Sequence, residues 1–166
     1  MPETDALAEL LEIAEIRKLK ARYCLYMDTK RWDLWRELFT EDLRVEGTKQ
    51  TPDATRDTFV DGVAASLDGV QTAHQVHEPI IAVAGDRARG VWPMYDDLRF
   101  PDGHPWAEGY GRRVGYGHYE EEYRKDAGVW RISVLRLVRL FVWREPDHPP
   151  VTGGVPSDGA TWLAGL

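Results

Sequence analysis

Asp28 is the first residue whose type and position suggest chemistry. It ends a long amphipathic helical pattern and follows the aromatic and apolar run from Tyr23 to Met27. A carboxylate in such surroundings needs a partner, because an isolated buried charge is costly. The best candidate is His74, in the short run from Ala73 to His77. The two residues would form a His-Asp dyad, in which the carboxylate orients an imidazole that acts as a general base.

Asp96 is a second candidate. Trp92, Met94 and Asp96 fall on one face of a predicted strand, whereas Asp97 points the other way, because strand side chains alternate. Burial beside large apolar groups favours the protonated carboxyl that a general acid requires. Strand parity alone favours the other interpretation, in which Asp96 caps the backbone or pairs with a buried arginine.

Two arginines lie within the last apolar strand. Alternation places Arg139 on the face of Leu135, Leu137, Phe141 and Trp143, and it places Arg136 on the opposite face. Each arginine needs an acid or a ligand, because an unpaired buried charge is costly. Both faces are apolar, so we expect one to meet the helices and a pocket and the other to meet a neighbouring subunit.

The remaining residues offer no metal or cofactor chemistry. His74 and His77 are three positions apart, which puts them on opposite faces of a strand, and the other histidines lie in or near polar segments without a compact ligand spacing. The sequence has no glycine-rich phosphate loop and no nucleophile elbow. Cofactor-free acid-base chemistry remains, with a histidine base, an orienting aspartate and a tyrosine hydroxyl that stabilises a developing oxyanion.

Composition excludes several classes of partner. The chain has 166 residues, a formal net charge of −7 and 43% hydrophobic residues, which predicts one domain with a real core and argues against nucleic-acid binding. The single cysteine, Cys24, is expected to be a buried, unreactive thiol in a reducing compartment. Neither a signal peptide nor a membrane-spanning stretch is visible, so we expect a cytoplasmic protein.

The elements that must position these residues begin with two helices. Thr4 or Asp5 is predicted to cap the first helix, and Thr29 the second. The first helix carries an apolar stripe predicted to face the core: Leu7, Leu10, Ile13, Ile16, Leu19, Tyr23 and Tyr26. The second carries Trp32, Trp35, Leu38 and Phe39. Asp28 would therefore lie at the joint between them.

The rest of the pattern is mainly strand. We expect a short strand at 43–45, a third helix ending at Gly69, and long strands at 71–84, 88–99, 110–124 and 129–143. This order predicts an α+β domain at 1–143, with helices packed on one face of a curved, mostly antiparallel sheet. Residues 144–166 form a Pro/Gly-rich tail, in which Trp162 and Leu163 are expected to cover a pocket mouth.

Several spaced anchors together resemble the SnoaL-like branch of the NTF2-like superfamily. The resemblance is strongest to bacterial bile-acid 7-alpha-dehydratases and weaker to scytalone dehydratases and hexachlorocyclohexane dehydrochlorinases. The anchors are Tyr23 with Asp28 and Trp32, the His74 and His77 pair, Trp92 with Asp96, and Trp130 with Arg139. Two departures are visible: Glu46 and Gly47 replace a strand tyrosine of such dehydratases, and the second histidine of scytalone dehydratases is replaced near Trp92.

The resemblance implies a cone-shaped barrel, a homotrimer and a catalytic set of Tyr23, Asp28, His74, Asp96 and Arg139. It implies a lyase of the dehydratase type that eliminates water from a small hydrophobic cyclic substrate, such as a steroid, terpenoid or polyketide. The expected substrate-binding residues are Tyr26, Trp92, Met94, Tyr119, Leu137 and Phe141. An isomerase or polyketide-type cyclase using the same base, and a non-catalytic binding subunit, remain the alternatives.

Overall fold

The computed structural model describes residues 3–46 and 55–146. Three helices and six strands follow one another in this order: α1 (Glu3–Asp28), α2 (Trp32–Arg36), β1 (Phe39–Glu46), α3 (Arg56–Ser66), β2 (Gln71–Val76), β3 (Ile80–Ala84), β4 (Arg87–Arg99), β5 (Arg112–Asp126) and β6 (Val129–Glu145). None of the helices in these ranges is long and apolar enough to cross a membrane.

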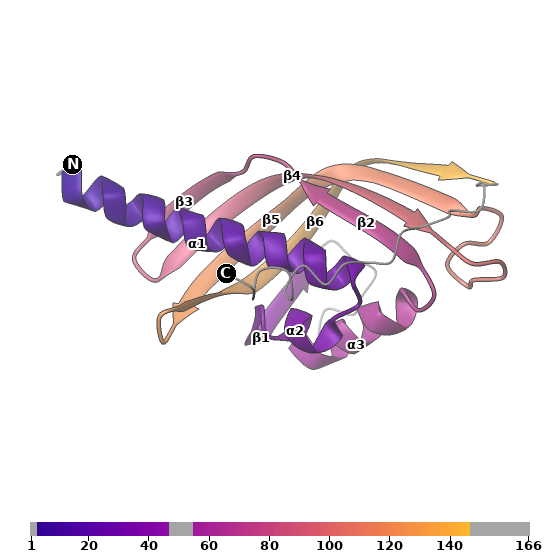
Figure 1. The fold of residues 1–166 in the computed structure, drawn as a ribbon, viewed down its shortest axis with the longest axis horizontal. Helices are drawn as coiled ribbons and strands as arrows, with labels where there is room; N and C mark the ends of the chain where they lie inside the picture. Colours follow the sequence, from indigo (N-terminus) through magenta and orange to yellow (C-terminus); the bar gives the residue numbers. More distant parts are fainter. Residues whose placement is uncertain (1–2, 47–54, 147–166) are drawn as a thin grey trace, which may run out of the picture.

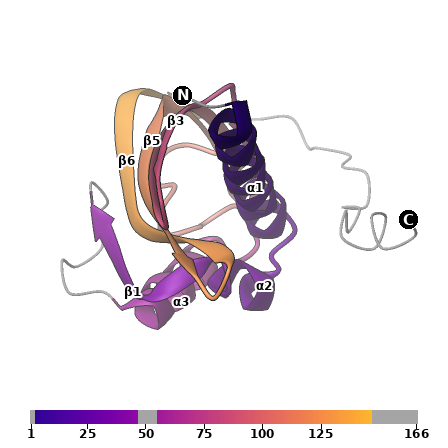
Figure 2. The same cartoon turned by 90° about the vertical axis from the view of Figure 1, so that its left-hand side faces the viewer.

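The strands form one curved sheet in the order β1-β6-β5-β4-β2, with β3 also paired to β4. Only the β1–β6 pair among these is parallel. Helix α1 lies across one face of the sheet, while α2 and α3 lie near β1 (Figures 1 and 2). We call the face under α1 the inner face and the opposite one the outer face. The expected α+β arrangement of helices on a curved, mostly antiparallel sheet is confirmed.

Apolar burial holds α1 to the inner face. Ile16, Leu19 and Tyr23 are buried against inner-face residues that include Trp92 and Tyr119. Each large side chain removed from water in this way stabilises the fold by roughly 1.5–3 kcal/mol. The predicted stripe is wrong at its beginning, because Leu7 and Leu10 are about 60% exposed (60% and 62%). The first turns of α1 extend past the edge of the sheet in Figure 1, so nothing in the described chain covers them.

The joint after α1 is tighter than predicted. Thr29 does not cap α2; its hydroxyl donates to the Leu25 carbonyl at 2.7 Å, and the N-cap position belongs to Arg31, which makes no side-chain capping bond. Lys30 has a φ of 59°, which reverses the chain within one residue. Helix α2 then lasts only to Arg36, and Phe39 begins β1 instead of continuing the helix.

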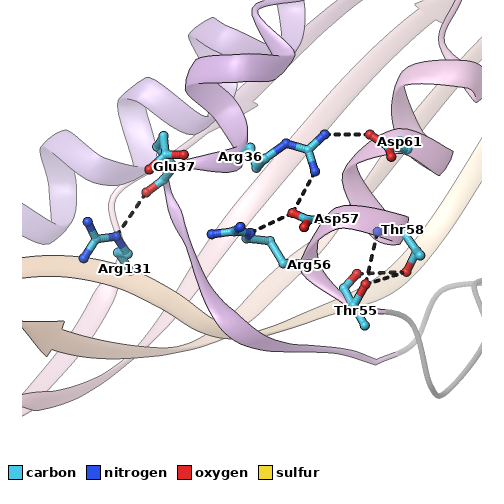
Figure 3. Close-up of polar contacts among 8 residues, drawn as sticks. All are labelled: Arg36, Glu37, Thr55, Arg56, Asp57, Thr58, Asp61 and Arg131. Atoms are coloured by element: carbon cyan, nitrogen blue, oxygen red, sulfur yellow. Dashed lines mark hydrogen bonds and ion pairs between the residues drawn. The ribbon is translucent and has the colours of Figure 1, made fainter.

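Polar contacts tie α2 to α3 (Figure 3). The Arg36 guanidinium donates to Asp57 at 2.8 Å and to Asp61 at 2.6 Å, and the Thr55 hydroxyl caps α3 by accepting from the Thr58 backbone N–H. Beneath these surface bonds, the Trp35 ring packs against Phe59 with centroids 5.5 Å apart. The two short helices therefore form one unit that closes an end of the core.

The predicted strand at 71–84 is interrupted. It divides into β2 and β3 at residues 77–79, since Pro79 has no N–H to donate to a ladder. β2 pairs with the C-terminal half of β4, and β3 pairs with its N-terminal half. The break leaves His74 within β2, opposite Asp96 of β4.

Strand β6 departs from simple alternation at two bulges. Tyr116 pairs with Phe141 and Gly117 with Arg139, so one extra residue is inserted at Leu140, and a second insertion falls at Ser133. A bulge moves the following side chains to the other face of the sheet. The strand also continues to Glu145, two residues beyond the predicted boundary, and the predicted contact of Trp162 and Leu163 lies outside the described residues.

Candidate active site

Asp28 and His74 form a close pair on the inner face. The Asp28 Oδ1 atom lies 2.6 Å from His74 Nδ1, and Asp28 Oδ2 accepts the His74 backbone N–H at 2.8 Å. One carboxylate thus fixes both the ring and the backbone of the histidine. The carboxylate beside Nδ1 favours the tautomer with the proton on that nitrogen, which leaves the Nε2 lone pair free to accept a proton.

Two neighbours hold the Asp28 carboxylate from its other side. The Thr72 hydroxyl donates to Asp28 Oδ1 at 2.8 Å, and the Lys30 ammonium donates to Thr72 Oγ1 at 2.9 Å. Thr72 and His74 share the inner face of β2, since side chains two apart point the same way. The end of α1 and the start of β2 therefore combine to position the dyad.

Asp96 and Arg139 form a second pair beside the dyad. The Arg139 Nη2 atom donates to Asp96 Oδ2 at 2.5 Å, and the Arg139 side chain is 26% exposed, whereas that of Asp96 is 2% exposed. This is the ion pair that strand parity favoured. The other oxygen, Asp96 Oδ1, is buried with no hydrogen-bond partner among the described residues.

Gly115 makes room for this second pair. A β-carbon at Gly115 would lie 2.0 Å from Arg139 Nη1 and 2.5 Å from Asp96 Oδ1, far inside van der Waals contact. The glycine thus lets both charged groups lie flat against β5. Arg139 is opposite Gly117 and shares the inner face with Leu137, because the bulge at Leu140 changes the register only after Arg139.

The sheet register brings the two pairs together. His74 and Asp96 are directly opposed on β2 and β4, which places their β-carbons roughly 4.5–5.5 Å apart. The Asp28 side chain is 24% exposed and that of Arg139 26%, whereas the His74 side chain is only 6% exposed. Four of the five predicted catalytic residues, Asp28, His74, Asp96 and Arg139, are therefore adjacent on one face.

Tyr23 lies deeper in the core. It is 2% exposed and packs against Tyr119, with ring centroids 5.6 Å apart. Burial raises the pKa of both tyrosines well above the ordinary value, with neighbouring ionisable groups adding to it. Each phenol consequently stays protonated, and it can donate a hydrogen bond but not act as a base.

A buried ion pair that sequence analysis missed lies along the same face. Lys20 Nζ donates to Glu121 Oε1 at 2.5 Å, and both side chains are fully buried. The ammonium also lies 3.8 Å from the centroid of the Tyr23 ring. Spacing could have revealed both residues, since Lys20 falls on the buried stripe four positions after Ile16, and Glu121 shares strand parity with Tyr119.

The Lys20–Glu121 pair continues into further polar contacts. Glu121 accepts from the Tyr123 hydroxyl, which in turn accepts from the Trp92 indole N–H at 2.7 Å. The Lys20 ammonium also lies over the Tyr119 ring, 3.6 Å from its centroid. We call Lys20, Glu121, Tyr123 and Trp92 the sealed network. Because its Trp92 N–H is already bonded, Trp92 offers only apolar surface to a ligand.

The predicted substrate-binding residues divide between the two faces. Met94 is buried on the inner face and its sulfur lies 3.6 Å from Arg139 Nη1, while Tyr26 and Leu137 are partly buried against the core. The prediction that Phe141 shares the inner face with Leu137 is wrong. Phe141 lies on the outer face, is 55% exposed and stacks on Tyr116 at 4.6 Å, because the bulge at Leu140 reverses its direction.

A cavity of about 610 Å³ opens on the outer face, away from the dyad. Its lining combines apolar residues with charged side chains, which are Asp42, Arg44, Arg87, Arg89, Glu122 and Arg124. Arg124 is already paired with Asp42, and Arg89 with Glu122. None of the residues of the two inner-face pairs lines this cavity. Within residues 3–46 and 55–146, no cluster of three or more histidine, cysteine or acidic side chains could hold a metal.

Comparisons with known proteins give a consistent result. The model of the SnoaL-like domain family matches residues 8–136. The chain is 24% identical over 143 residues to the probable cyclase FGR4 of Gibberella zeae. The alignment covers 79% of this chain and 92% of that protein.

Two solved structures extend the comparison. Rv3472 of Mycobacterium tuberculosis, a protein of unknown function, is 28% identical, with a TM-score of 0.66 over 84% of this chain and 76% of that one. A type 2 hexachlorocyclohexane dehydrochlorinase (LinA) is 16% identical, with a TM-score of 0.75 over 90% of this chain and 99% of that one. At 16% identity, the second likeness shows the fold alone.

Proposed function

The chain belongs to the SnoaL-like domain family and has its NTF2-like fold, and we propose that it is a cofactor-independent lyase in which His74 is the base. One observation carries the proposal: the 2.6 Å contact between His74 Nδ1 and Asp28 lies directly beside a second, partly exposed charged pair. A base held by one carboxylate next to a separate polar pair is the arrangement that proton abstraction coupled to loss of a leaving group requires.

In the proposed reaction, His74 Nε2 removes a proton from a carbon next to a carbonyl or similar group. The electrons of the broken C–H bond pass to the carbonyl oxygen, and their return forms a C=C bond as the C–O bond to the leaving hydroxyl breaks. The departing hydroxide takes up the proton that His74 accepted and leaves as water, which restores the neutral imidazole. Asp28 stabilises the imidazolium formed in the first step.

The second pair acts on the leaving group. Arg139 has N–H groups beyond the one bonded to Asp96, and these can donate to the departing oxygen. The Asp96 Oδ1 atom is buried and has no partner among the described residues, so it could accept a hydrogen bond from a substrate hydroxyl if the surrounding side chains open to admit one. Tyr23 stays protonated but is only 2% exposed, so its predicted donation to the enolate-like oxygen would require neighbouring side chains to move aside.

The substrate class is a small hydrophobic ring compound. The side chains near the two pairs are mainly aromatic and aliphatic, including Tyr26, Met94 and Leu137. An apolar wall with a few convergent polar groups is typical of such sites.

A panel of cyclic β-hydroxy ketones and β-hydroxy thioesters tests the proposal, with mass spectrometry detecting a loss of 18 Da, the mass of water. His74→Ala and Asp28→Asn should each lower turnover by about 10²–10⁴-fold. His77→Ala is the matched control, because His77 follows the end of β2 and takes no part in the dyad. Full turnover in the His74→Ala protein would show that the dyad assignment is wrong.

A cyclase is the second candidate, supported by the similarity to a probable cyclase. Abstraction of the same α-proton would begin both reactions, and only the fate of the enolate differs. Conversion without change of mass, together with loss of activity in His74→Ala, would favour cyclisation or isomerisation. Ligand binding without any conversion would favour a non-catalytic binding subunit.

For assembly we propose a homotrimer that uses the outer face. Phe141 and Trp143 are 55% and 63% exposed there, and a small chain gains by covering such apolar area. Light scattering should give three times the 19.0 kDa chain mass. A monomer mass at micromolar concentration would contradict the proposal.

A further inference from the structure

Lys30 is connected to the dyad by an unbroken series of hydrogen bonds. Its ammonium donates to Thr72 Oγ1 at 2.9 Å, the Thr72 hydroxyl donates to Asp28 Oδ1 at 2.8 Å, and that oxygen lies 2.6 Å from His74 Nδ1. Only two groups, one hydroxyl and one carboxylate, separate the ammonium from the imidazole. A charge at Lys30 therefore acts on His74 over a short path through a partly buried region.

The backbone at Lys30 is strained. Its φ of 59° lies in the left-handed region, where glycine is the usual residue after a helix. Ala127, the other described non-glycine residue with positive φ, lies in a hairpin turn that such residues commonly occupy. This conformation ends α1, because the Arg31 backbone N–H donates to the Tyr26 carbonyl at 2.8 Å across the turn. At Lys30, the reversed backbone carries the ammonium back onto Thr72.

The groups that face the Lys30 ammonium come from each neighbouring element. Asp28 approaches from α1, Thr72 and then His74 from β2, and the Trp32 ring from α2, with its centroid 5.7 Å away. Burial lowers the pKa of Lys30 to about 8, and the charge of Asp28 partly opposes this. Lys30 therefore carries its charge at neutral pH and loses it only slightly above.

From this arrangement we propose that Lys30 is a positioning residue: through Thr72 it fixes the Asp28 carboxylate, and its charge sets the pH range in which His74 can serve as a base. The inference deepens the proposed function and depends on it. A positive charge near the imidazole opposes its protonation, so removal of the Lys30 charge should make His74 easier to protonate. Asp96 of β4, which is opposite His74, and Arg139 of β6, which pairs with Asp96, keep their charges in such a variant.

Substrate-free NMR titration of the His74 ring tests this directly. In Lys30→Met the midpoint of the His74 titration should move to higher pH by about half a pH unit or more, the size expected for removing one charge within roughly 8 Å. Lys30→Arg should keep the wild-type midpoint, because it retains the charge. Thr72→Val should give an intermediate shift, because it breaks the connection but leaves the charge.

Lys18→Met is the matched control for the loss of one positive charge. Lys18 lies on α1, is 61% exposed and pairs with Glu15, so its removal should leave the His74 midpoint unchanged. Amide spectra verify that each variant is folded, and Lys30→Gln replaces Lys30→Met if the latter is not. A Lys30→Met or Lys30→Gln midpoint equal to that of wild type would overturn the inference.

Asp28→Asn separates failure of this inference from failure of the proposed function. If that variant moves the His74 midpoint to lower pH and Lys30→Met leaves it unchanged, the dyad stands and only the role of Lys30 is wrong. If Asp28→Asn also has no effect, the dyad itself fails, and with it the inference. Once a substrate is known, the acid limb of the pH profile of kcat/KM should move to higher pH in Lys30→Met. If Lys30 had only a structural role, its replacement would not move this limb.

Discussion

Two pairs of opposite charges lie on the inner face of the same sheet, and they differ in what surrounds them. In the sealed network, Lys20 and Glu121 are fully buried, and Glu121 also accepts from Tyr123. At the other pair, Arg139 is partly exposed and Asp96 keeps one oxygen without a partner among the described residues. Burial of charge alone does not mark a reactive site. The Asp96–Arg139 pair differs from the sealed network in the partial exposure of its arginine and in the unused hydrogen-bonding capacity of its carboxylate.

The largest effect is expected from breaking the sealed network. Lys20→Met leaves the Glu121 carboxylate uncompensated in the core, which should lower the free energy of unfolding by about 3–5 kcal/mol. Urea denaturation measures the change. The double variant Lys20→Met/Glu121→Leu should recover much of the loss, because it removes both charges together. If the single variant loses less than about 1 kcal/mol, the network is not the structural element that its burial implies.

A smaller effect, on activity in place of stability, is expected at Gly115. The added methyl group of Gly115→Ala would displace Arg139 and Asp96 from their positions, and a misplacement of about 1 Å can lower turnover by about 10²-fold. Gly62→Ala, on an exposed turn of α3, is the matched control and should leave turnover unchanged. Wild-type turnover in Gly115→Ala would mean that the second pair need not be precisely placed.

The pH dependence of stability distinguishes Lys30 from the sealed charges. Its folded pKa of about 8 is below the ordinary value of 10.5, so between these values the unfolded chain binds more protons than the folded one. The stability of wild type relative to Lys30→Met should therefore be lowest below pH 8 and should increase as the pH rises toward 10.5. Thermal denaturation across this range measures the difference. A constant difference would contradict the depressed pKa.

The bulge at Leu140 can be tested by truncating one residue on each side of it. Leu137→Ala removes an inner-face contact and should lower substrate affinity or turnover several-fold. Phe141→Ala removes exposed outer-face surface and should change the assembly mass while leaving the turnover of any assembled protein unchanged. If Phe141→Ala lowered turnover and Leu137→Ala changed only the assembly mass, the simple alternation of side chains, and not the bulged register, would describe β6 in solution.

The smallest effect concerns Cys24. Burial raises its pKa to about 11, with Lys20 opposing the shift, so only about one thiol in 10³ is ionised at pH 8. Reaction of the native protein with a disulfide reagent should accordingly be much slower than that of the urea-unfolded chain. Equal rates would mean that the core around the sealed network opens readily.

Local sequence was enough to predict the contact between Asp28 and His74 and the general fold. Asp28 was predicted as a helix-end carboxylate and His74 as its strand partner, because burial of a charge demands a counterpart and periodicity shows which residues are buried. The hairpin turns at 84–87 and 125–128 were predicted for a similar reason, since glycine accepts the positive φ that they contain, as at Gly85 and Gly128. Residue type and spacing encode these features directly.

Other features depend on contacts that are distant in the chain. Strand alternation predicted the wrong face for Phe141, because a bulge depends on how two strands pair. No residue type within β6 indicates where the bulge occurs. Lys30 and Thr72 join the dyad only because a strained turn at the end of α1 meets the start of β2, 42 residues later in the chain. The sequence by itself determined which groups must be buried and in what pattern. Only the tertiary structure decided which of them keep solvent access and an unused hydrogen bond, because both depend on what packs around them.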